Sequence, residues 1–497
     1  MTLTATVCWC ISGRFDNLKK TGSKWRIARY LIKFQHNSIR LSYDRSKMME
    51  TREELDKRLV AVTPSERQIK FQETEFYAFV HFTVNTFTDK EWGDGTENPA
   101  IFNPKKLNAE QWVKAIVDAG MRGLILTCKH HDGFCLWPSK LTNHTVAYSP
   151  FKRDIVREVS DACRKYGIKF GVYLSPWDRN SKLYGQGKAY DDFFVGQLKE
   201  LLTGYGNIFC VWFDGACGEG ENGKKQFYDW DRYYAVIREL QPEACINVCG
   251  PDIRWCGNEA GHTRPAEWSV VPARTRDTEK IAENSQKEDN EEFRQRKISA
   301  WDQDLGSRGL LEKEHELVWY PAEVNTSIRP GWFWHESEND KVRPLQDLIH
   351  VYENSVGGNS TFLLNIPPTN EGLFHENDVK RLHEIGEYLR KEYAVNLAEQ
   401  SGASIETGEN GKTVLVRLSK VSAVSHVVLQ EDIRFSQRVE SFHIEAQQDG
   451  VYKTVYSGTV IGYKKIITFE PAIYTDSLRI IIEDSRKDPK VMFVGVY

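Results

Sequence analysis

Two carboxylates lie in sequence settings that suit catalysis. Asp214 follows a fully apolar run and precedes Gly215, and Glu259 lies in a loop between Gly257 and Gly261. Paired carboxylates without a cofactor motif are the equipment of glycoside hydrolysis, in which one residue is the nucleophile and the other the proton donor. An Asp in this position equally caps a helix or holds a loop, and Glu259 by itself is one of many Glu residues. Spacing alone therefore leaves both roles open.

Histidine and aromatic residues accompany these carboxylates. His81, His130, His131 and Asp214 could together hold zinc. However, adjacent residues on a strand point to opposite faces, and the sequence has no HExxH motif. We therefore expect no metal, and an ordinary buried histidine remains an alternative for His81. Further polar and aromatic residues follow the same predicted strands. With the carboxylates and histidines they predict a pocket for a hydroxyl-rich ligand. The further residues are Lys129, Asp132, Tyr173, Ser175, Trp177, Asp178, Asp252, Arg254, Trp255, Arg329, Trp332 and Trp334.

The elements that position these residues alternate in type between residues 75 and 395. Apolar runs predict strands at 76–84, 122–131, 168–175, 207–215, 244–250, 316–324 and 361–368. Amphipathic stretches between them predict helices, among them 107–120, 153–167, 190–206, 231–242 and 345–358. Strand–helix units with nearly continuous apolar strands indicate an α/β fold with parallel strands. A closed (β/α)8-like (TIM) barrel fits best, with a doubly wound open sheet as the alternative. In a barrel, catalytic groups follow the carboxyl ends of the strands, where the residues above lie.

The sequence pattern changes near residue 396, where the helical periodicity ends. Alternating strands at 413–418, 425–430, 441–447, 452–458, 465–470, 477–483 and 491–497 predict an antiparallel β-sandwich. We therefore expect a catalytic barrel at 51–395 and a sandwich at 396–497, which packs against the barrel or, alternatively, binds sugar. The polar segment 262–315 interrupts the barrel, and we expect its charged middle to be a solvated loop.

Residues 1–50 differ from the rest of the chain. Residues 1–49 carry ten Lys or Arg and two Asp, and a short apolar run precedes the basic residues. That order is the reverse of a signal peptide. We expect a basic N-terminal extension that is dispensable for the fold, with a basic anchoring arm as the alternative.

The composition limits the classes of partner. The 497 residues carry a net charge of −4, with 27% charged and 40% hydrophobic residues, which excludes a wholly disordered chain. We expect no nucleic-acid partner, because the charge balance is acidic, and no membrane partner, because no apolar run approaches about 18 residues. Ten Cys without a CxxC motif predict reduced, buried thiols, with a zinc site or a disulfide framework as the alternatives, and favour a reducing compartment. The missing signal-peptide pattern favours a cytoplasmic location. The 14 Trp and 21 Tyr offer stacking surfaces that suit carbohydrate rings.

Several long motifs occur in order between about residues 79 and 335. They are HFTVNTFTDKEWGDGTENPAIFNP, LTCKHHDGFCLWPS, KFGVYLSPWD, VWFDGA, RWCGNEAG and VNTSIRPGWFWH. In these motifs the sequence resembles glycoside hydrolase family 29, the α-L-fucosidases. The GNEAG segment resembles the branch of that family that prefers α-1,3- and α-1,4-linked fucose on branched glycans. The flanking barrel and β-sandwich also match the family's architecture.

The resemblance implies a retaining exo-α-L-fucosidase that acts on a fucosylated oligosaccharide or glycoconjugate without a cofactor. Asp214 matches the nucleophile and Glu259 the general acid/base. The residues that match those hydrogen-bonding the fucose hydroxyls are His81, His130, His131, Tyr173, Glu91 and Trp92. Trp332 matches the aromatic residue that packs against the fucose methyl group. Two alternatives remain: a metal-dependent hydrolase that uses the three histidines and Asp214, and a non-catalytic sugar-binding protein.

Overall fold

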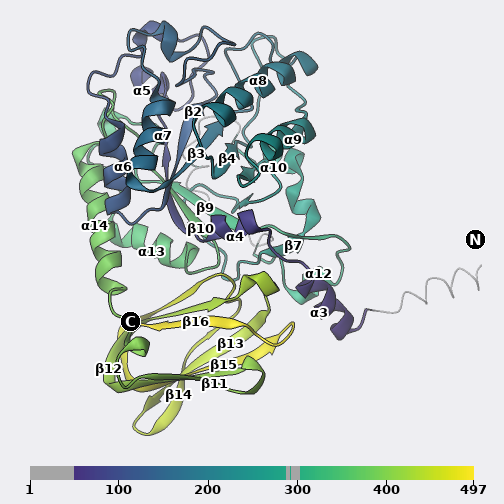
Figure 1. Cartoon of the computed structure of the whole chain (residues 1–497), viewed down its shortest axis with the longest axis vertical. Helices are drawn as coiled ribbons and strands as arrows, with labels where there is room; N and C mark the ends of the chain where they lie inside the picture. Colours follow the sequence, from purple (N-terminus) through teal and green to yellow (C-terminus); the bar gives the residue numbers. More distant parts are fainter. Residues whose placement is uncertain (1–49, 287–291, 293–302) are drawn as a thin grey trace, which may run out of the picture. The chain divides into compact units, whose positions relative to one another are not determined.

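A computed structural model describes residues 50–286, residue 292 and residues 303–497 (Figure 1). The expected N-terminal extension falls, apart from residue 50, on residues 1–49, which lie outside the described residues. Leu55–Tyr497 forms one compact unit. Among the described helices, none combines the length and the apolar character needed to cross a bilayer.

Eight parallel strands form the central sheet of this unit, in the order β5-β4-β3-β2-β1-β10-β9-β6. They are β1 (Phe76–Val80), β2 (Gly123–Lys129), β3 (Lys169–Leu174), β4 (Cys210–Phe213), β5 (Cys245–Val248), β6 (Arg254–Trp255), β9 (Ala322–Ser327) and β10 (Thr361–Asn365). A parallel bridge between Asn247 and Ile253 links the two outermost strands, so the barrel is nearly closed. The expected (β/α)8-like barrel is therefore confirmed over the doubly wound open sheet.

Two barrel strands differ from the sequence-based expectation. β6 lies where a loop was expected; it has 2 residues and follows β5 through a turn, so it leaves no periodic pattern. The expected strand 316–324 was wrong as a single element. It divides at Tyr320–Pro321 into β8 (Leu317–Trp319), which pairs antiparallel with β7 (Val270–Pro272), and the barrel strand β9. Proline has no N–H for a sheet ladder, which accounts for the break.

Helices cover the outer face of the barrel (Figure 1). The main ones are α6 (Ala109–Asp118), α7 (Ile155–Tyr166), α8 (Lys188–Gly204), α9 (Trp230–Leu240), α13 (Leu345–Ser355) and α14 (Glu376–Glu392). Shorter helices are α3 (Arg52–Val60), α4 (Glu66–Gln72), α5 (Asn85–Thr88), α10 (Thr278–Asn284) and α12 (Arg308–Leu311). Local signals set the helix ends: the Asn108 side chain accepts the Gln111 N–H at the start of α6, and Gly167 ends α7 with φ 72°.

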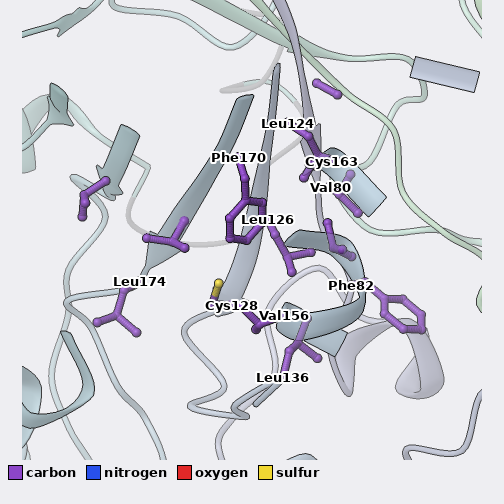
Figure 2. Close-up of a cluster of buried hydrophobic side chains, with 14 of the residues drawn as sticks. Val80, Phe82, Leu124, Leu126, Cys128, Leu136, Val156, Cys163, Phe170 and Leu174 are labelled. Atoms are coloured by element: carbon purple, nitrogen blue, oxygen red, sulfur yellow. The ribbon is translucent and has the colours of Figure 1, made fainter. Parts of the chain in front are cut away.

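The barrel core lies between the strands and these helices. Figure 2 shows Val80 of β1, Leu126 and Cys128 of β2, and Val156 and Cys163 of α7 in one cluster. Burial raises the pKa of both thiols, which keeps them protonated. The expectation of buried thiols therefore holds for these two cysteines.

The C-terminal part is a six-stranded antiparallel sheet. Its strands are β11 (Ser404–Thr407), β12 (Thr413–Glu431), β13 (Val439–Gln448), β14 (Val451–Gly458), β15 (Lys465–Ser485) and β16 (Val491–Val496). The expected strands 413–418 and 425–430 are halves of β12, and 465–470 and 477–483 are halves of β15, with register shifts between the halves. Side chains from both halves share one core, so the sheet folds around it as a sandwich.

This sheet packs against the barrel, as expected. The Ile466 N–H donates to the Gly357 carbonyl at 2.9 Å, and the Asn359 N–H donates to the Lys464 carbonyl at 3.0 Å. The Tyr463 hydroxyl also donates to Glu75 Oε1 at 2.9 Å.

Candidate active site

A cavity lies at the carboxyl ends of the barrel strands. Of the further pocket residues expected from the sequence, Trp255 lines the cavity, whereas Lys129, Asp132, Ser175, Trp177, Asp178, Asp252, Arg254, Arg329 and Trp334 do not. Of the nine residues that the family resemblance assigns to the site, eight line the cavity, namely His81, Glu91, Trp92, His130, His131, Asp214, Glu259 and Trp332. The remaining one, Tyr173, is fully buried beside the cavity and donates its hydroxyl proton to Asp214 Oδ2 at 2.9 Å. Residues from several strand ends and loops thus converge on one place.

Asp214, directly after β4, is held through both of its oxygens. Oδ1 accepts the Ala216 N–H at 2.8 Å, and Oδ2 accepts the Tyr173 hydroxyl. Burial raises the pKa of this carboxyl, and these hydrogen bonds act in the opposite direction. The carboxylate therefore has a fixed orientation at the cavity wall.

His131 and His81 are neutral and present hydrogen-bond acceptors. Burial lowers the pKa of each to about 3. Ser175 donates its proton to the Trp177 carbonyl at 2.6 Å, so it accepts from His131 Nδ1 at 2.7 Å. Asn365 uses its NH₂ on the Trp332 carbonyl, so its Oδ1 accepts from His81 Nδ1 at 2.8 Å. In both rings Nε2 is left as an acceptor, which suits the hydroxyl donors of a sugar.

His130 and His131 both face the cavity although they are adjacent in sequence. They follow β2, beyond its register shift, so strict strand alternation no longer applies. Ligand atoms of His130, His131 and Asp214 lie within 4.8 Å of one another, which would permit a metal ion. His81 is not part of that group. His130 Nδ1 is buried without a hydrogen-bond partner in the described structure, and burial lowers the pKa of this ring well below its usual value.

Glu259 lies in a loop that the Asn258 side chain shapes. Asn258 Oδ1 accepts the N–H groups of Ala260 and His262 at 3.1 and 3.0 Å. The Trp332 indole Nε1–H donates to Glu259 Oε2 at 2.9 Å. Trp332 thus links the loop after β9 to the loop after β6, in addition to lining the cavity.

Glu91 clamps the Trp332 segment from the loop after β1. Its Oε2 accepts the Trp332 N–H at 2.8 Å, and its Oε1 accepts the Phe333 N–H at 2.9 Å and contacts His335 Nε2 at 2.8 Å. The hydrogen bond to Glu91, joined by one to Asp89, raises the His335 pKa to about 9. Protonated His335 thus pairs with both carboxylates. Sequence reasoning missed this role of His335, although its motif was singled out.

Aromatic residues form much of the remaining wall. The Trp92 ring lies 5.2 Å from the His131 ring, and the Tyr173 ring stacks on Trp212 at 5.3 Å. Trp212 lines the cavity and donates its Nε1–H to the buried Glu323 at 2.7 Å. Glu323 was missed because it lies inside β9, within an expected strand whose boundaries were wrong.

The insertion after β6 also reaches the cavity. Ser285 and Gln286, which follow α10, are 8% and 5% exposed and line its wall. The expectation of a solvated loop is therefore wrong for these two residues. A Cβ on Gly215 would lie 2.2 Å from Ser285 Oγ, so the glycine after Asp214 allows this close approach. The isolated Ile281 of α10, which packs on the core, is the only sequence signal for this contact.

The barrel, its paired carboxylates, neutral histidines and aromatic walls together define a glycoside hydrolase. The family model described as alpha-L-fucosidase matches residues 63–393. "Alpha-L-fucosidase 1" of Arabidopsis thaliana is 38% identical over 467 residues, which covers 87% of this chain and 87% of that protein.

Solved structures agree with this match. The structure of a protein from Bacteroides ovatus described as a "putative alpha-L-fucosidase" has a TM-score of 0.82 and 46% sequence identity to this chain. The match covers 91% of this chain and 76% of the Bacteroides ovatus chain. A Ruminococcus gnavus glycoside hydrolase family 29 fucosidase in complex with fucose has a TM-score of 0.75 and 28% identity, over 88% of this chain and 95% of that one. The chain therefore belongs to the α-L-fucosidase family, glycoside hydrolase family 29, and it is an enzyme that hydrolyses α-L-fucosides.

Proposed function

We propose that the enzyme releases terminal α-L-fucose by a retaining double displacement with Asp214 as the nucleophile. The observation that carries this proposal is that Asp214 and Glu259 line the same cavity, each oriented by a specific donor. Asp214 attacks the anomeric carbon and forms a covalent fucosyl ester, which water then hydrolyses. The Tyr173 and Ala216 hydrogen bonds favour its ionised form, which attack requires.

Glu259 is the proposed general acid and base. It protonates the leaving-group oxygen in the first step and removes a proton from water in the second. The Trp332 N–H fixes one of its oxygens, so the carboxyl keeps a defined orientation through both steps.

The sugar is held by the surrounding groups. Nε2 of His81 and of His131 accept hydrogen bonds from fucose hydroxyls, and His130 and Tyr173 complete this polar side. Trp332 packs against the methyl group that replaces a hydroxymethyl in L-fucose. Glu91 and Trp92 contact further hydroxyls, although Glu91 also clamps the Trp332 backbone.

Paired variants test the two carboxylate roles. Asp214→Ala should abolish release of fucose from all substrates, and added azide should restore turnover with formation of a fucosyl azide. Glu259→Ala should lose far more activity on glycans with poor leaving groups than on 2-chloro-4-nitrophenyl fucoside, because that leaving group needs no protonation. Equal loss on both substrates would contradict the acid role of Glu259.

We further propose a preference for α-1,3- and α-1,4-linked fucose of Lewis-type glycans, because the loop with Glu259 carries the GNEAG motif. The test compares fucose released from a Lewis-type trisaccharide and from an α-1,2-fucosylated control. Release from the first alone supports the preference, and equal release from both contradicts it.

The cluster of His130, His131 and Asp214 also keeps a metal-dependent hydrolase as a second candidate. Metal analysis of the purified enzyme, with activity measured after chelation, separates the two. Activity that survives chelation excludes a metal mechanism. Activity that is lost on chelation and restored by zinc would instead favour the metal-dependent hydrolase over the double displacement.

A further inference from the structure

A second hollow lies at the same end of the barrel, and we call it the side groove. It is lined by residues 95–99 after β1, by 141–144 and Tyr148 after β2, by 180–183 after β3, and by Phe193 of α8. The loop after β1 contributes to both hollows, because Trp92 lines the catalytic cavity and residues 95–98 line the side groove. The side groove is therefore adjacent to the cavity along one loop.

The side groove is amphipathic. Tyr148, Leu141 and Leu183 are 61%, 43% and 37% exposed, which is unusual for large apolar side chains grouped in one place. Asn143 and Ser181 provide amide and hydroxyl groups beside them. A sugar ring presents an apolar C–H face and a rim of hydroxyls, so this combination suits it.

A buried histidine adds an unsatisfied group to the wall. His144 is 5% exposed, and its Nε2 has no hydrogen-bond partner among the described residues. A buried polar atom without a partner costs free energy. His144 lines the side groove, and its Nε2 is a polar atom within the wall that the described residues leave unpaired.

The walls of the side groove are held in place by hydrogen bonds. Glu97 accepts the N–H groups of Asp94 and Gly95 at 2.8 and 2.9 Å, and the Asn180 side chain donates to the Gly95 carbonyl at 2.8 Å. A Cβ on Gly95 would lie 2.4 Å from the Arg179 backbone, so these loops are in close contact. Preformed walls reduce the entropy lost on binding.

We propose that the side groove is a saccharide-binding site that holds a neutral sugar unit of the glycan whose terminal fucose occupies the catalytic cavity. The sugar stacks on Tyr148 and bonds to the Asn143 amide. Glu97 and Lys182 contribute opposite charges to the lining, so the lining does not select an anionic sugar. This inference rests on the proposed function, because it assumes a fucosylated glycan in the cavity.

The test compares Tyr148→Ala and Asn143→Ala with the wild type on two substrates. Tyr148→Ala should lower kcat/KM for a branched fucosylated oligosaccharide roughly threefold to tenfold, mainly through KM. Neither variant should change kcat/KM for 4-nitrophenyl α-L-fucoside, because this substrate carries no further sugar unit to occupy the side groove. Phe227→Ala is the matched control, because Phe227 is 84% exposed between β4 and α9 and lines neither hollow.

Two results would overturn the proposal: an unchanged kcat/KM on the oligosaccharide, or an equal loss on both substrates. Calorimetric titration with the fucose-free glycan provides an independent readout. Binding to the wild type that weakens in Tyr148→Ala supports the site, and absence of binding rejects it. If the wild type hydrolyses neither substrate, the proposed function fails, and this titration still decides the side groove by itself.

Discussion

At the scale of single residues, hydrogen bonds determine which state each cavity group presents. Ser175 and Asn365 fix the same tautomer in His131 and His81, so both rings offer Nε2 as an acceptor. Tyr173 donates to Asp214, which favours the carboxylate. Donors and acceptors are thus arranged before a sugar enters, which reduces the reorganisation needed during the reaction.

The Trp332–Glu259 hydrogen bond gives the first residue-scale prediction. Trp332→Phe keeps an aromatic wall but removes the N–H that orients Glu259. We expect kcat on a glycan substrate to fall about tenfold, the value of one hydrogen bond, with little change in KM. Trp334→Phe is the control, because its indole donates to Asn339 outside the cavity. A larger change in KM than in kcat would show that Trp332 acts mainly through packing.

His335 gives a prediction for pH dependence. The ordinary pKa of a histidine side chain is 6.5, and beside Glu91 and Asp89 the pKa of His335 rises to about 9. The folded protein therefore holds this proton more tightly than the unfolded chain, and the resulting stabilisation is full below about pH 6.5 and lost as the pH rises through about 9. His335→Gln removes it, so the urea midpoint should fall less in the variant than in the wild type between those pH values.

The control for this prediction is His383→Gln. His383 pairs with Asp118 at 2.7 Å, but its side chain is 51% exposed, so solvent screening should make its effect small. Identical pH dependence in the wild type and His335→Gln would show that the Glu91 clamp does not depend on His335.

At the scale of elements, the sequence predicts the repeated strands and helices of the barrel and misses the features that occur only once. The apolar strands β1 to β5 and the amphipathic helices follow from the sequence pattern, and the residues after each strand follow from the barrel rule. β6 has 2 residues and no helix before it, so it leaves no pattern. The cavity contact of Ser285 depends on a tertiary approach to Gly215 that no local signal encodes. Likewise, the clamp by Glu91 joins residues 241 positions apart.

The contact between Gly215 and the α10 segment can be tested by a suppressor pair. Gly215→Ala places a methyl group 2.2 Å from Ser285 Oγ and 3.1 Å from Ile281 Cγ2. We expect kcat/KM to fall at least about tenfold, because displacement of the adjacent Asp214 weakens attack. Ser285→Gly should restore part of this activity in the double variant, which a double-mutant cycle measures. Additive losses of kcat/KM in the double variant would show that contact with Ser285 does not displace Asp214.

At the scale of the whole molecule, the barrel and the C-terminal sheet share polar groups. Glu353 of α13 accepts from Thr468 at 3.0 Å, contacts His426 at 3.1 Å and accepts from Tyr388 of α14 at 3.1 Å. Burial alone would raise the Glu353 pKa, but the hydrogen bond and charge of His426 outweigh it and lower the pKa. The carboxylate thus joins two barrel helices to the sheet, and its stabilisation is lost as the pH falls below the usual Glu range.

Glu353→Ala tests whether this junction couples the two parts during unfolding. The variant leaves His426, which is 2% exposed, without its carboxylate, so we expect a loss of about 2–4 kcal/mol in the free energy of unfolding. The kcat/KM on 4-nitrophenyl fucoside at 25 °C should not change, because Glu353 does not line the cavity. Urea unfolding followed by fluorescence and by far-UV circular dichroism measures the loss, with the exposed Glu387→Ala as control. If the barrel and sheet fold as one cooperative unit, both probes shift together; separate transitions in the wild type would show that this junction joins two independently stable parts.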